Sequence, residues 1–158
     1  MVIKPRAKPK AELWKARTSE DRLLRAYSRK TGGTIFAEVR VGESVPGAEH
    51  RSIDGVRLKS SGKQEIKRFK VNHNDFHRRL SCAKEVEVIE VKKYLGRYGI
   101  GQAIVAKYLL EWEYTKTKAT PVMMCDNGDS LLEHICTRKL GIRVWTPRGG
   151  FARGKLLR

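Results

Sequence analysis

Residues 85–95 of the chain, EVEVIEVKKYL, decide the fold class. Valine and isoleucine alternate with charged residues, the pattern of a β-strand. Because successive side chains of a strand point to opposite sides, Val86, Val88, Glu90 and Lys92 share one face. The other face takes Glu87, Ile89 and Val91. Glu90 and Lys92 therefore project on the same side, roughly 6–7 Å apart along the strand.

Further elements are expected on both sides of this strand. A hydroxyl followed by two acids at 18–21 is a helix start, and Gly32 and Gly33 end that helix. Gly96, Gly99 and Gly101 mark a loop before the next helix. The expected order is helix, three strands, helix, strand, helix and strand, at 18–31, 34–42, 51–58, 85–95, 101–114, 121–125, 130–140 and 142–147. This order predicts an α/β sandwich whose mixed sheet begins with antiparallel hairpins and continues through helical crossovers.

The charge of the chain is distributed unevenly. The chain has 158 residues, enough for one domain, with 34 Lys and Arg against 17 Asp and Glu, a net charge of +17. Nearly all of this excess lies in 1–17, 59–84 and 148–158. We therefore expect a nearly neutral core at 18–147 that carries a basic N-terminal arm, a basic insertion at 59–84 and a basic C-terminal tail. Such an excess favours a polyanionic partner.

Composition also bears on location. No apolar stretch approaches the length of a membrane span, and the N-terminus lacks the apolar run of a secretory signal. The three cysteines have no paired spacing, so a disulfide framework is not expected. These features predict a cytoplasmic protein with no membrane partner. Cys125 and Cys136 are expected to be buried thiols.

Acidic residues stand on two strands where a core would favour apolar ones. Asp54 lies between Ile53 and Val56, and Glu90 continues the apolar face of Val86 and Val88. Carboxylate oxygens are the ligands that Mg²⁺ prefers, and a water that Mg²⁺ or Mn²⁺ acidifies is a nucleophile for phosphodiesters. These acids, with Lys92, predict a metal-dependent hydrolytic site.

In these residues the chain resembles the PD-(D/E)XK nuclease superfamily. The superfamily has an acid on its second strand and acid-x-lysine on its third, matched here by Asp54 and by Glu90-Val91-Lys92. Glu20 stands where a leading-helix glutamate is found, and Gln102 stands where several branches have a glutamine. The departures are Ile53 in place of the proline before Asp54, the long insertion, and Ala106 where repair-type branches have tyrosine. The resemblance covers about 18–147 and implies a restriction-endonuclease-like three-layer sandwich, with a mixed central sheet flanked by helices.

The resemblance also implies roles for these residues. Asp54 and Glu90 would bind Mg²⁺ or Mn²⁺, with the Val91 carbonyl as a third ligand. Lys92 would orient the attacking water, and Glu20 and Gln102 would hold metal-bound waters or substrate. Glu38 competes with Glu20 for its role. Structural alternatives also exist, since Asp54 precedes a turn-forming glycine and Glu20 stands in a helix first turn.

Other residues are candidates for nucleic-acid contact. The expected contacts are Lys67, Arg68, Lys70, Arg78, Arg79, Lys93, Arg97 and Tyr98. Phe69 and Phe76 either pack the insertion onto the core or stack on bases. His73 and His77 with Cys82 form only a partial zinc spacing, which we disfavour.

The function expected is a metal-dependent endonuclease that hydrolyses DNA phosphodiesters in repair, recombination, restriction or a mobile element. Its substrate would be double-stranded or branched DNA, for which a homodimer would be suited. The alternative is a non-catalytic DNA- or RNA-binding protein that retains the nuclease-like fold. Glu87, on the opposite strand face, is expected to matter little for chemistry.

Overall fold

The computed structural model describes residues 14–42, 46–47, 49–59 and 64–153. Most of the expected arm at 1–17 and the end of the tail therefore lie outside the described residues. The helices and strands are α1 (Ser19–Thr31), β1 (Thr34–Val41), β2 (Arg51–Lys59), β3 (Glu65–Arg68), α2 (His73–Leu80), β4 (Glu85–Tyr94), α3 (Arg97–Glu113), β5 (Ala119–Asn127), α4 (Ser130–Ile135), β6 (Arg143–Thr146) and β7 (Gly150–Phe151). A 3₁₀ turn, η1 (Phe69–Val71), precedes α2, and a π-helical turn, η2 (Cys136–Leu140), follows α4.

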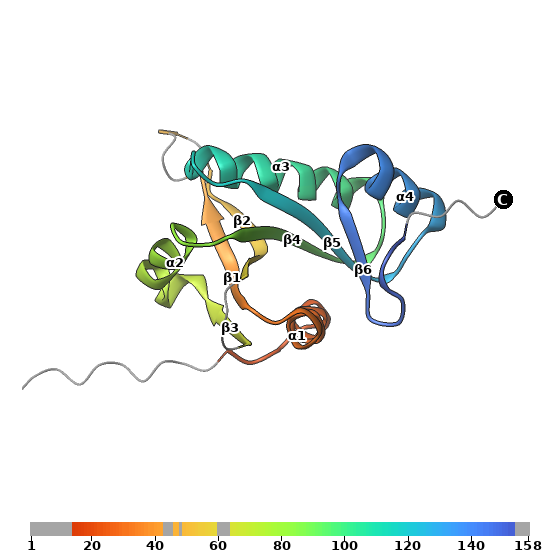
Figure 1. Ribbon diagram of the computed structural model, residues 1–158, viewed down its shortest axis with the longest axis horizontal. Helices are drawn as coiled ribbons and strands as arrows, with labels where there is room; N and C mark the ends of the chain where they lie inside the picture. Colours follow the sequence, from red (N-terminus) through yellow and green to blue (C-terminus); the bar gives the residue numbers. More distant parts are fainter. Residues whose placement is uncertain (1–13, 43–45, 48, 60–63, 154–158) are drawn as a thin grey trace, which may run out of the picture.

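The strands form one mixed sheet in the order β3-β1-β2-β4-β5-β6-β7. The β1–β2 and β2–β4 pairs are antiparallel, whereas β4, β5 and β6 are parallel and are connected through α3 and α4. Figure 1 shows α3 on one side of the sheet and α1 on the other. The expectation of an α/β fold with antiparallel hairpins followed by helical crossovers is confirmed, and the arrangement is compatible with a three-layer sandwich.

The two faces of β4 are those that its alternation predicts. Val86 and Val88 belong to the hydrophobic cluster that includes Leu110 of α3. Ile89 and Val91 belong to the cluster that includes Leu23, Leu24 and Tyr27 of α1. Since β4 is covered on both faces, polar side chains on it need a partner or a function.

The helix α3 begins earlier than the sequence predicts. Gly99 and Gly101 are helical, so the expected loop through these glycines is wrong. A Cβ at Gly99 would approach the Cε of Met123 to 2.9 Å and the Cγ of Lys92 to 3.0 Å. Gly99 therefore serves the close packing of α3 on β4 and β5, and not a turn.

The basic insertion is part of the folded domain. Its residues form β3, which pairs with β1 in parallel, and α2. Phe69 and Phe76 are buried and pack edge-to-face, and Phe76 also packs on Phe36 of β1. Of the two roles expected for these phenylalanines, the structure supports packing. At the other end of the chain, Gly150–Phe151 of the expected tail form β7 against β6.

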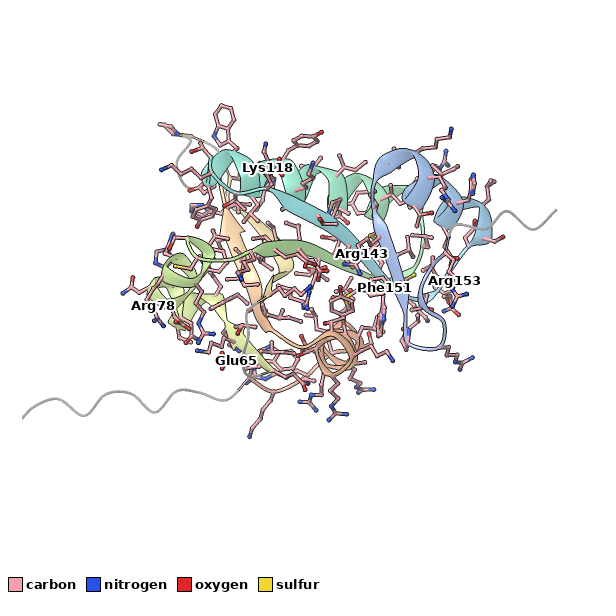
Figure 2. All side chains as sticks on the ribbon, in the orientation of Figure 1. Glu65, Arg78, Lys118, Arg143, Phe151 and Arg153 are labelled. Carbon is pink, nitrogen blue, oxygen red and sulfur yellow. The ribbon has the colours of Figure 1, made fainter. Side chains whose placement is uncertain are left out.

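Glu87 is a buried structural anchor. Its carboxylate is 1% exposed and accepts hydrogen bonds from the Tyr27 hydroxyl at 2.8 Å and from Arg143, and pairs with Arg57 at 2.9 Å. Figure 2 shows Arg143 beside Phe151, whose ring its guanidinium covers at 3.9 Å. Glu87 links α1, β2, β4 and β6, so its removal would disturb the fold itself.

Cys125 and Cys136 are buried, as expected, and burial raises the pKa of both thiols to about 11. None of the helices in the described part of the chain combines the length and apolar character needed to cross a bilayer.

Candidate active site

Asp54 and Glu90 lie together at the end of the β2–β4 ladder. The ladder ends at the pair of Gly55 and Ile89, and Asp54 and Glu90 are the next residues of their strands. Asp54 Oδ2 accepts the Val91 backbone N–H at 2.8 Å, and the charge of Asp54 raises the pKa of Glu90. Two acids that lie 36 positions apart in the sequence are thus within electrostatic reach of each other.

Lys92 joins this pair from the same strand face as Glu90. Its Nζ lies 2.6 Å from Glu90 Oε1, within both hydrogen-bond and ion-pair distance. The side chain of Glu90 is almost fully buried, while that of Lys92 is 29% exposed. Gly99 packs against the aliphatic part of the Lys92 side chain. The first turn of α3 therefore restricts the positions that the Lys92 ammonium group can take.

Electrostatics distinguish these acids from ordinary surface carboxylates. Burial raises the pKa of Asp54, more than the Val91 N–H and Lys92 lower it. Burial, with the neighbouring charge of Asp54, likewise raises the pKa of Glu90 despite its bond to Lys92. Burial lowers the pKa of Lys92, but the hydrogen bond and charge of Glu90 outweigh this and raise it. One lysine faces two acids that lie close together, so the negative charge of the site is only partly compensated. This charge balance favours the binding of a further cation.

Both acids expected to support the site lie within its electrostatic reach. Glu20, exposed in the first turn of α1, raises the pKa values of Glu90 and Lys92. Glu38 lies opposite Asp54 in the β1–β2 register and raises the Asp54 pKa. Its φ of 59° is left-handed, a conformation that costs a non-glycine residue energy and is common at functional sites. The structure therefore leaves both Glu20 and Glu38 as candidates for the supporting acid.

A pocket of about 650 Å³ lies beside Glu90, between the start of β2 and α3. Gln102 lines this pocket, and its Oε1 is buried without a hydrogen-bond partner among the described residues. A buried amide oxygen without a donor is costly, so this atom is suited to accept a hydrogen bond from a bound water or ligand. Gln102 and Glu90 therefore line the same pocket, and the role of Gln102 in the site stays a prediction.

The predicted nucleic-acid contacts divide into two groups. Arg97 and Tyr98 line the pocket with Glu90, and Lys70 and Lys93 are exposed. The Arg68 guanidinium lies 3.5 Å from the carboxylate of Glu38 on β1.

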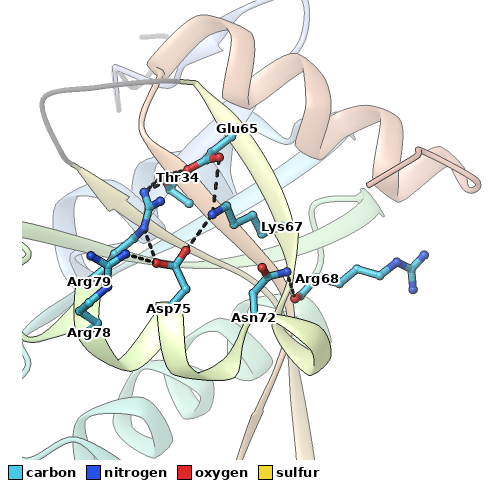
Figure 3. A network of polar contacts seen from close by, with 8 residues as sticks. All are labelled: Thr34, Glu65, Lys67, Arg68, Asn72, Asp75, Arg78 and Arg79. Atoms are coloured by element: carbon cyan, nitrogen blue, oxygen red, sulfur yellow. Dashed lines mark hydrogen bonds and ion pairs between the residues drawn. The ribbon is translucent and has the colours of Figure 1, made fainter. Parts of the chain in front are cut away.

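The other three residues belong to a polar network on β3 and α2. Figure 3 shows Asp75 between Lys67, Arg78 and Arg79, at 2.6–3.0 Å, with Arg79 also bonded to Glu65. These cations are partly neutralised inside the protein, which weakens the case for Lys67 and Arg79 as phosphate contacts. Arg78 is 76% exposed and keeps donors available.

Sequence reasoning missed Arg51 as a member of this site. Arg51 is exposed and lines the pocket beside Glu90. The available signal was its position three residues before Asp54, at the start of the same strand. Its guanidinium also pairs with the exposed Glu49 at 3.0 Å, and an arginine beside Glu90 is suited to hold a phosphate group.

The donor set fits a divalent cation. Among the described residues, Asp54 Oδ1 and Glu90 Oε2 accept no hydrogen bond, so each carboxylate offers one oxygen. Within the same residues, no cluster of three or more His, Cys, Asp or Glu has the arrangement of a metal site, so two carboxylates would be completed by other oxygens. The carbonyl of Val91 as such a ligand stays a prediction.

The histidines considered for zinc lie apart from this site, on α2. His73 Nε2 and His77 Nε2 are 2.8 Å apart. Cys82, beyond the end of α2, has its Sγ 3.7 Å from the Ser81 hydroxyl.

No protein-family model, curated protein or solved structure shows significant similarity to this chain. The assignment of the site therefore rests on its own geometry.

Proposed function

We propose that this chain is a metal-dependent endonuclease that hydrolyses phosphodiester bonds of DNA, on a restriction-endonuclease-like fold. One observation carries the proposal: Asp54 and Glu90 lie together at the end of the β2–β4 ladder, both with raised pKa values, and Lys92 contacts Glu90 at 2.6 Å. Two carboxylates with a lysine in contact are a set suited to hydrolysis of phosphate esters.

The roles proposed follow from the positions of the side chains. Asp54 and Glu90 would hold Mg²⁺ or Mn²⁺, which when bound acidifies water and neutralises charge on the phosphate. With a cation on the carboxylates, the Lys92 ammonium would be free to leave Glu90 and to donate to the attacking water or a phosphate oxygen. Gln102 Oε1 would orient a water, and Arg51 and Arg97 would hold the phosphate backbone at the rim.

The net charge of +17 supports a nucleic acid as the substrate. The proposal includes a cytoplasmic location, double-stranded or branched DNA as substrate, and a role in repair, recombination, restriction or a mobile element. The same charge also fits the alternative, a DNA- or RNA-binding protein that kept the fold without catalysis. Binding alone therefore does not test the proposal.

Cleavage of plasmid and branched DNA with Mg²⁺ or Mn²⁺ is the direct test. The wild type should cut, and Lys92→Ala should lose on the order of 100-fold or more in the single-turnover rate at saturating DNA. Lys118→Ala, at an exposed lysine just before β5, is the matched control and should cut normally. Tight binding by the wild type without cleavage would favour the non-catalytic alternative.

A further inference from the structure

The outer face of α3 carries a row of exposed apolar side chains. Tyr98, Val105, Tyr108 and Trp112 are 55–78% exposed. With Gly101, their positions alternate in steps of three and four residues, the a/d spacing of a helix that packs along its length against another helix. In Figure 1, α3 lies on the outside of the sheet, and its outer side faces away from the other described elements. A large exposed apolar row marks an interaction surface.

Gly101 is a second and independent observation on this face. Glycine is a poor helix former, and at this position the protomer gives no reason for it. Gly101 is exposed, has no left-handed φ, and a Cβ built on it would meet nothing within 4 Å. Gly99, two residues earlier, is explained by packing on Met123 and Lys92. A partner that approaches α3 closely from outside would explain Gly101.

The row is complementary to itself. When two α3 helices are set antiparallel with their centres between Val105 and Tyr108, Gly101 of one helix faces Trp112 of the other. In the same register, Val105 faces Tyr108. Each layer thus matches a small side chain with a large one, as close helix packing requires. We propose that the outer face of α3 is the two-fold interface of a homodimer, in which the α3 helices of two copies of this chain pack antiparallel.

Charge favours a second copy over a polyanion on this face. The chain carries +17, so two copies repel each other over most of their surfaces. The row from Tyr98 to Trp112 has no charged side chain among its five members. The Lys107 ammonium lies 4.9 Å from the centroid of the Tyr108 ring, but it pairs with Glu111 at 3.9 Å, which limits the repulsion between two copies there. A nucleic acid would instead favour a face rich in Lys and Arg.

The area is near what a dimer needs. An aromatic side chain has about 150–250 Å² to bury, so the three exposed aromatic residues offer roughly 400 Å² per copy. Two copies offer roughly 800 Å² before Val105 and the half-buried Leu109 are counted, close to the 1,000 Å² or so that a specific interface exceeds. Tyr98, Gly101 and Val105 also line the pocket beside Glu90, so the partner's α3 would form an outer wall of that pocket.

Sedimentation equilibrium at high salt, with nucleic acid removed, tests the interface without reference to nuclease activity. The wild type should have twice its chain mass of 18.0 kDa. Val105→Glu should weaken the dimer at least about tenfold, because it places two charges in the seam. Leu131→Glu, at an exposed apolar residue of α4, is the matched control and should leave the dimer intact. A monomeric wild type, or equal effects of the two variants, would overturn the proposal.

Exchange of the sizes of two facing residues tests the antiparallel register. Gly101→Leu adds apolar surface and helix propensity, so it would strengthen a nonspecific association. In the proposed interface the larger side chain would instead clash with Trp112 of the partner, and the variant should be monomeric. Adding Trp112→Ala to Gly101→Leu should restore the dimer, since leucine and alanine then face each other in place of glycine and tryptophan. Circular dichroism should show both variants folded. A failure of this restoration would overturn the register. A monomer whose tryptophan fluorescence is quenched by single-stranded DNA, with the quenching lost in Trp112→Ala, would overturn the dimer and identify a nucleic-acid surface.

Discussion

Asp54→Asn should make the metal-free protein more stable and remove its response to metal. Burial holds the Asp54 carboxylate in an unfavourable environment, and the nearby Glu90 carries the same charge. The pKa values of both carboxyls are raised, so the native state binds their protons more tightly than the unfolded chain does. Their stabilising effect is present below the usual carboxyl pKa and is lost as the pH rises through the raised values. At neutral pH, the ionised pair therefore destabilises the fold.

The magnitude follows from Coulomb's law. Asp54 is close enough to raise the pKa of Glu90, and like charges about 5–6 Å apart repel by about 3 kcal/mol at an effective dielectric constant near 20. Loss of the attraction between Asp54 and Lys92 offsets much of this gain, so we expect a net stabilisation of about 1 kcal/mol, or roughly 2–4 °C in Tm. The asparagine Oδ1 can still accept the Val91 N–H, which preserves the local backbone.

Bound metal should make the wild type more stable than Asp54→Asn. A cation on Asp54 and Glu90 binds only the native state, and at ten times its Kd it adds about 1.4 kcal/mol of stability. Thermal denaturation followed by circular dichroism, with chelator or with Mg²⁺ or Mn²⁺, measures both effects. Wild-type Tm should rise with metal, more at pH 8 than at pH 5, while Asp54→Asn should not respond.

The matched control is Asp126→Asn, the same chemical change at an exposed aspartate of β5. It should leave both Tm and the metal response unchanged. A metal response retained by Asp54→Asn would refute the role of Asp54 as a ligand. A lower Tm of Asp54→Asn in chelator would refute the electrostatic reasoning.

Three further predictions concern the buried ion pair of Glu87, the packing of Gly99 on Lys92, and the basic N-terminal arm. Glu87→Gln should lower the free energy of unfolding by about 3–5 kcal/mol in urea titrations, because it leaves Arg57 buried without its counter-charge. Gly99→Ala should reduce the single-turnover cleavage rate more than DNA affinity, since its methyl group would displace the Lys92 stem. Deletion of 1–17 should lower DNA affinity and flatten its salt dependence, measured by fluorescence anisotropy, without removing cleavage at saturating DNA.

The two faces of β4 could be predicted because its side chains alternate with a period of two, and both faces are covered by other elements. Its central position also follows from the many β-branched residues of 85–95. The start of α3 could not be predicted, because glycines favour loops locally, and only contact with Met123 and Lys92 shows why Gly99 is helical. β3 and α2 were missed for a related reason: their charge obscured the few apolar residues, such as Phe76, that fix them to the core.

The candidate site depends on pairing that the sequence does not contain. Asp54 and Glu90 stand out one strand at a time, and their proximity follows from the placement of β2 beside β4 and from the hydrogen bond of Asp54 with the Val91 N–H. The left-handed φ of Glu38 and the entry of Arg51 into the pocket have no local signature. Both are consequences of how β1 and β2 are placed beside β4 and α3.

Glu87 and Glu90 show why partners decide the meaning of a buried acid. Both stand on β4, three residues apart, and both are nearly inaccessible to solvent. Glu87 is surrounded by Arg57, Arg143 and the Tyr27 hydroxyl, so its charge is satisfied within the fold. Glu90 shares one lysine with Asp54, and its pKa is raised. An acid that the fold leaves under-compensated is costly to keep, and the cost is explained if a cation completes the site.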